Sequence, residues 1–113
     1  MIDTQPADVN TPYARISGDG AGLHALETDT VIERFKTDGA LLLRGFEYDL
    51  AGFRSFTARF CCRFVRNESG RRDQISGDGT TQSVNLGHEA FPLHPELSRV
   101  PWRPDIAWFA CAQ

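Results

Sequence analysis

Apolar residues recur along the first half of the chain with helical and then strand-like spacing. Thr30 and Glu33 form a capping-box pattern before a short apolar face, and Gly39 suits a helix C-terminus, which predicts a helix from Thr30 to Gly39. The apolar segment 40–46 is short and ends in Arg-Gly, so it predicts a buried strand. Asp49 is placed to cap a second helix. Phenylalanines at spacings of three and four predict one core face of that helix: Phe53, Phe56, Phe60 and Phe64.

The second half is richer in polar and turn-forming residues. Residues 66–80 predict a long loop, in which Arg71 and Arg72 are interpreted as solvated, with an anionic substrate as the alternative partner. Residues 81–86 partly alternate and predict a strand, after which several prolines limit regular structure. The apolar segment 105–112 is the last predicted strand. Its candidate core residues are Trp108 and Phe109.

The order of these elements predicts the fold class and the domain organisation. Residues 1–27 are rich in Gly, Asp, Pro and Thr and lack periodicity, which predicts an irregular N-terminal arm. Residues 28–113 predict an α+β domain in which helices cover a β-sheet core. The length of 113 residues suits one small domain.

Composition excludes several classes of protein. The net charge of −3 lacks the basic excess typical of nucleic-acid-binding domains. No apolar run is long enough for a membrane span, and the N-terminus has no basic start or apolar stretch of a secretory signal. An odd number of cysteines does not suit a disulfide framework. We therefore expect reduced thiols in a cytoplasmic protein without a nucleic acid or membrane partner.

His94 and Glu96 are the candidate metal ligands. Residues i and i+2 of an extended segment project to the same side, so this imidazole and this carboxylate can reach one cation. Iron(II) accepts such a mixture, and two histidines with one carboxylate leave positions open for substrate chemistry. A surface His and Glu beside prolines is the competing interpretation. His88 and Glu89 make a poorer chelate, because neighbouring strand residues point to opposite faces.

Over residues 29–113 the order of segments resembles the TauD/TfdA family of iron(II)- and 2-oxoglutarate-dependent dioxygenases. The segments are, in turn, "GALLLRGF", a phenylalanine-bearing helix, a loop, "LHPEL" and "PDIAWFAC". The resemblance implies a double-stranded β-helix (jelly-roll) core with flanking helices, of which 28–113 is the N-terminal part. It implies that His94 and Glu96 are the first two iron ligands, in a clavaminate-synthase-like variant. The family's distal histidine and its arginine for 2-oxoglutarate lie far downstream, so we expect them beyond Gln113.

The resemblance implies an oxygenase that uses Fe(II) and 2-oxoglutarate to hydroxylate or similarly oxidise a small molecule. The glutamate variant favours an amino acid or an amino-acid-derived metabolite, free or carrier-bound. Asn85, Leu86 and Phe91 precede the ligands and are candidate substrate-side residues, with turn and packing roles as the alternative. A non-catalytic module of the same fold and a hydrolytic metal site are the competing functions. We expect no turnover from these 113 residues alone, and the sequence does not predict the oligomeric state.

Overall fold

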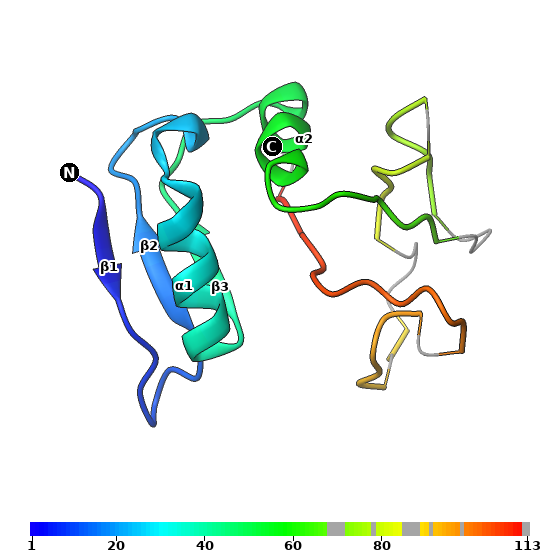
Figure 1. The fold of residues 1–113 in the computed structure, drawn as a ribbon, viewed down its shortest axis with the longest axis horizontal. Helices are drawn as coiled ribbons and strands as arrows, with labels where there is room; N and C mark the ends of the chain where they lie inside the picture. The colour runs from blue at the N-terminus through cyan, green and yellow to red at the C-terminus, as the bar shows by residue number, and fades with distance from the viewer. Residues whose placement is uncertain (68–71, 78, 85–88, 91, 98, 112–113) are drawn as a thin grey trace. The chain divides into compact units, whose positions relative to one another are not determined.

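The chain folds as two compact units, which are described separately. They are Met1–Phe60 and Cys61–Gln113. Within the described residues, all the helices and strands lie in the first unit (Figure 1). The computed structural model describes residues 1–67, 72–77, 79–84, 89–90, 92–97 and 99–111.

A three-stranded mixed sheet forms the base of the first unit. The central strand β2 (Ala14–Ser17) pairs antiparallel with β1 (Asp3–Gln5) and parallel with β3 (Leu41–Arg44). The prediction of an irregular arm over residues 1–27 is therefore wrong, because this segment supplies two of the three strands and the 3-10 helix η1 (Leu23–Ala25). Both strands are very short, so their pairing partners define them better than their own residue pattern does.

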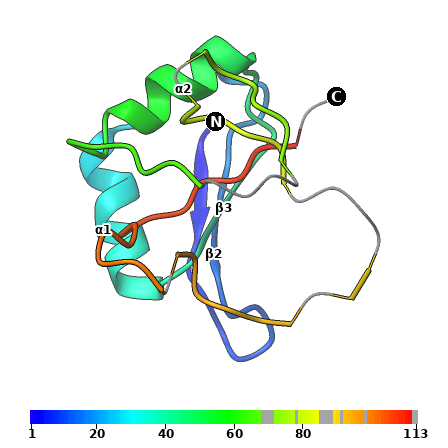
Figure 2. The ribbon, with the colours of Figure 1, turned by 90° about the vertical axis from the view of Figure 1, so that its right-hand side faces the viewer.

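Helix α1 (Thr28–Asp38) connects β2 to β3 and lies against one face of the sheet (Figures 1 and 2). Ala14 and Ile16 of β2 are fully buried, and Val31 of α1 is almost so. Gly39 ends the helix in the left-handed conformation at φ +78°, as predicted. The predicted capping box at Thr30 is wrong, since the helix begins two residues earlier and its N-cap, Glu27, makes no side-chain capping bond.

Helix α2 (Leu50–Ala58) begins as predicted, with the Asp49 carboxylate accepting a hydrogen bond from the Gly52 amide at 2.7 Å. The predicted core face is present in part. Phe56 is buried and packs edge to face on Phe60, with 5.0 Å between the ring centroids. The helix ends before Phe60 and Phe64, and Phe64 is 43% exposed. A stripe continues only while the backbone stays helical, so the helical spacing no longer applies at Phe64.

The second unit contains no named helix or strand in the part that the structure describes. An isolated antiparallel bridge joins Gln74 to Gln82. Strands were predicted over 81–86 and 105–112. No ladder forms over 81–84 and 105–111, the parts that the structure describes, so the prediction is wrong there. Phe109, predicted as a core residue, is 71% exposed. A strand needs a hydrogen-bonded neighbour, and an apolar pattern alone does not supply one.

The jelly-roll prediction is left open by these elements. A three-stranded mixed sheet and two α-helices are too few to distinguish a jelly roll from other α+β folds. Neither α-helix is long and apolar enough to cross a lipid bilayer, as judged over the described residues.

Candidate functional site

His94 and Glu96 lie side by side in the irregular segment 92–97 of the second unit. The Nε2 atom of His94 is 3.6 Å from Oε1 of Glu96. A cation about 2.1 Å from each ligand atom can join two atoms that are up to about 4 Å apart. The two side chains therefore lie within reach of one metal ion.

The imidazole of His94 is oriented by its own backbone segment. Its Nδ1 atom lies 2.8 Å from the carbonyl oxygen of Pro92. Because a carbonyl oxygen only accepts hydrogen bonds, this contact requires a proton on Nδ1. In a neutral ring of this tautomer the lone pair is on Nε2, the nitrogen that lies on the side of Glu96. Metal-binding histidines are commonly held in this way, with the second ring nitrogen donating to a carbonyl or carboxylate.

Prolines shape the backbone on which the pair sits. Pro95 fixes its own φ and disfavours the helical conformation for His94, which favours an extended backbone at the first ligand. The chain turns immediately afterwards, where Leu97 has φ +49° and its carbonyl accepts a hydrogen bond from the Val100 amide. A left-handed leucine is unusual and is typical of a backbone constrained by its surroundings.

Arg72 is the third side chain at this place. Its Nη2 atom lies 3.8 Å from Oε1 of Glu96, the same oxygen that faces His94. The Arg72 side chain is 17% exposed and that of Glu96 is 27% exposed, so both are sheltered. Sequence reasoning considered Arg72 only as a solvated residue or a contact for an anionic substrate. Its one signal was a pair of arginines in a glycine-containing loop, which does not predict Glu96 as a partner.

The pair is not completed to a three-ligand group within the described ranges. No set of three or more His, Cys, Asp or Glu side chains there is placed to hold a metal ion. The predicted substrate-side residues Asn85, Leu86 and Phe91 lie outside the described residues, as does His88 of the competing pair.

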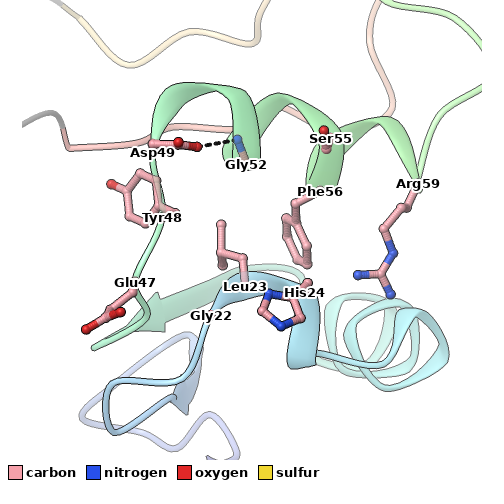
Figure 3. Close-up of a pocket in the computed structure, with 10 residues that line it drawn as sticks. All are labelled: Gly22, Leu23, His24, Glu47, Tyr48, Asp49, Gly52, Ser55, Phe56 and Arg59. Carbon is pink, nitrogen blue, oxygen red and sulfur yellow. Dashed lines mark hydrogen bonds between the residues drawn. The ribbon is translucent and has the colours of Figure 1, made fainter.

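A separate pocket of about 620 Å³ lies in the first unit between η1 and α2 (Figure 3). Leu23 and Phe56 project into it, while His24 and Tyr48 lie at its border. Sequence reasoning gave His24 no role. The pocket is open and joins apolar to polar groups, and its residues form no metal-ligating group of three or more within the described ranges.

Arg59 borders the same pocket and has a structural role that sequence reasoning missed. Its guanidinium donates to the Leu26 carbonyl at 2.8 Å and to Thr28 Oγ1 at 2.7 Å, and it lies over the rings of Phe56 and Phe60. It therefore ties the end of α2 to the start of α1.

Comparison with known proteins adds no family assignment. No protein-family model, no curated protein and no solved structure matches the chain. The functional argument therefore depends on the residues and on their geometry.

Proposed function

We propose that this chain provides the first two metal ligands of an iron(II)- and 2-oxoglutarate-dependent oxygenase that acts on a small molecule. The observation that supports this proposal is the convergence of His94 and Glu96. The Nε2 atom of His94 and Oε1 of Glu96 lie 3.6 Å apart, and the other ring nitrogen contacts the Pro92 carbonyl.

The donor set fits iron(II). Imidazole nitrogen with a carboxylate oxygen is the mixture that non-haem iron(II) sites use, and a second histidine, as the third protein ligand, would leave three positions open. With dioxygen as the oxidant and 2-oxoglutarate as the co-reductant that becomes succinate and carbon dioxide, a bound iron(II) would supply the chemistry that converts a C–H bond to a C–O bond. His94 and Glu96 would hold the metal on one side, and the Pro92 carbonyl would keep the imidazole oriented.

The remaining parts of the proposal come from the resemblance to TauD/TfdA dioxygenases. A distal histidine and an arginine for 2-oxoglutarate would complete the site, and Asn85, Leu86 and Phe91 would line the substrate side. The favoured substrate is an amino acid or an amino-acid-derived metabolite, free or carrier-bound. The alternative is a non-catalytic module of the same fold.

The formation of succinate by the protein that contains these residues tests the proposal. With iron(II), 2-oxoglutarate and dioxygen, we expect succinate to form, and we expect His94→Ala and Glu96→Gln each to reduce succinate formation at least 100-fold. The loss follows because an open site with three protein ligands tolerates the removal of one poorly. Succinate is measured by mass spectrometry.

His24→Ala is the matched control, since it removes an exposed imidazole from the first unit. It should keep the wild-type rate of succinate formation. Succinate formation by His94→Ala at the wild-type rate would exclude His94 as an iron ligand. Binding of iron without any succinate would favour the non-catalytic module.

A further inference from the structure

A single carboxylate oxygen at the candidate site faces two different partners. Oε1 of Glu96 lies 3.6 Å from His94 Nε2 and 3.8 Å from Arg72 Nη2. The second distance exceeds that of a hydrogen bond, so the contact between Arg72 and Glu96 is ionic and not directional. The guanidinium keeps its positive charge at any pH at which the protein is folded.

A metal ion at this oxygen would be placed next to a like charge. A cation about 2.1 Å from Oε1 would lie roughly 5 Å from the guanidinium, near enough for repulsion to affect binding. Both charges are attracted to one carboxylate, whose own charge can balance only one of them fully. Binding free energies are reciprocal, so the pairing with Arg72 must weaken metal binding as much as the metal weakens the pairing.

We propose, given the metal site proposed above, that Arg72 acts as a latch on Glu96 that a divalent cation must displace. In the metal-free protein the guanidinium balances the charge of Glu96 and keeps this carboxylate beside His94. When a cation binds, Arg72 withdraws from Oε1. Arg72 is thus a positioning residue that sets the affinity for metal without itself ligating the metal.

Manganese(II) binding to the protein tests the latch, with free Mn²⁺ followed by its electron paramagnetic resonance signal. We expect Arg72→Gln to bind Mn²⁺ about ten-fold more tightly than the wild type at low salt, the size expected for a unit charge about 5 Å from a dication in water-like surroundings. The difference should shrink as salt is added, because screening weakens the repulsion. Arg72→Lys keeps the charge and should stay near the wild-type affinity.

Arg63→Gln is the matched control, because it removes the same net charge from an exposed arginine of the same unit. It should leave Mn²⁺ affinity within about two-fold of the wild type, since salt and solvent screen an exposed charge. Unchanged or weaker Mn²⁺ binding by Arg72→Gln, with Arg72→Lys behaving like the wild type, would overturn the latch.

His94→Ala separates failure of the latch from failure of the site. If His94→Ala loses Mn²⁺ binding but Arg72→Gln does not tighten it, the metal site stands and the latch is wrong. If His94→Ala binds Mn²⁺ as the wild type does, the metal site itself is wrong and the latch fails with it.

Discussion

Backbone chemistry at two prolines explains why His94 and Glu96 converge. Pro95 disfavours the helical conformation at His94, an extended backbone places residues i and i+2 on one side, and the Pro92 carbonyl accepts a hydrogen bond from Nδ1 of His94. The spacing alone predicted that both side chains project to one side. It did not predict the tautomer, because that depends on a carbonyl whose direction is set by the fold of the segment.

The contact between Arg72 and Glu96, unlike the convergence of His94 and Glu96, was not predictable from the sequence. Arg72 precedes Glu96 by 24 residues along a loop rich in glycine and polar residues. The path of such a loop is not encoded in hydrophobic periodicity, so no sequence pattern indicates which carboxylate the guanidinium meets. The His94–Glu96 motif was therefore predictable from the sequence, whereas the pairing of Arg72 with Glu96 was not.

Cys61 provides a prediction for pH dependence. Burial raises the pKa of its thiol above the ordinary value of 9.0, and the neighbouring Cys62 adds to the effect. We expect iodoacetamide to alkylate Cys61 more slowly in the folded protein than in the urea-unfolded protein at pH 9, because the thiolate is the reactive form. Peptide mass spectrometry measures the two rates.

The sign of the linked stability change follows from the same shift in pKa. The folded state holds the Cys61 proton more tightly than the unfolded state, so this contribution to stability is present below pH 9.0 and is lost as the pH rises through the raised pKa. Equal alkylation rates at pH 9 in the two states would contradict the raised pKa.

At the scale of elements, helix ends were easier to predict than strands. Asp49 and Gly39 have side-chain and backbone chemistry specific to helix ends, and both occupy the predicted capping positions. Thr30 has equally suitable chemistry but lies inside α1, so the capping-box pattern misplaced the start of that helix. Strands β1 and β2 were missed, because three or four residues carry too little periodicity to indicate a strand.

Two phenylalanines that looked equivalent in the sequence should differ in their effect on stability. Phe56→Ala should destabilise the first unit by about 3–4 kcal/mol, since it removes a buried ring and leaves a cavity. Phe64→Ala should cost less than about 1 kcal/mol, because its ring is 43% exposed outside α2. Urea unfolding followed by circular dichroism gives both values. Similar losses for the two variants would show that Phe64 is also part of a core.

At the scale of the whole molecule, the described helices and strands lie in one unit, and the candidate metal ligands lie in the other. The sheet and both α-helices belong to Met1–Phe60, while His94, Glu96 and Arg72 belong to Cys61–Gln113. The apolar pattern predicted the α1–β3–α2 order of the first unit. The expectation that the strand at 40–46 is buried is wrong, because half-buried and exposed residues alternate along β3. The strands expected in the second unit did not form over its described residues, because a ladder requires partners that the pattern does not specify.

The central claim is that His94 and Glu96 bind one divalent cation, and nuclear magnetic resonance of the histidine rings tests it most directly. Paramagnetic Mn²⁺ broadens signals only from nuclei close to it. The method therefore shows which residues lie near a bound ion even when the ion binds weakly. Substoichiometric Mn²⁺ should broaden the ring signals of His94 first and leave those of His24 sharp, and Glu96→Gln should abolish this selectivity. Equal broadening of the two rings, or selective broadening of His94 that persists in Glu96→Gln, would contradict the claim.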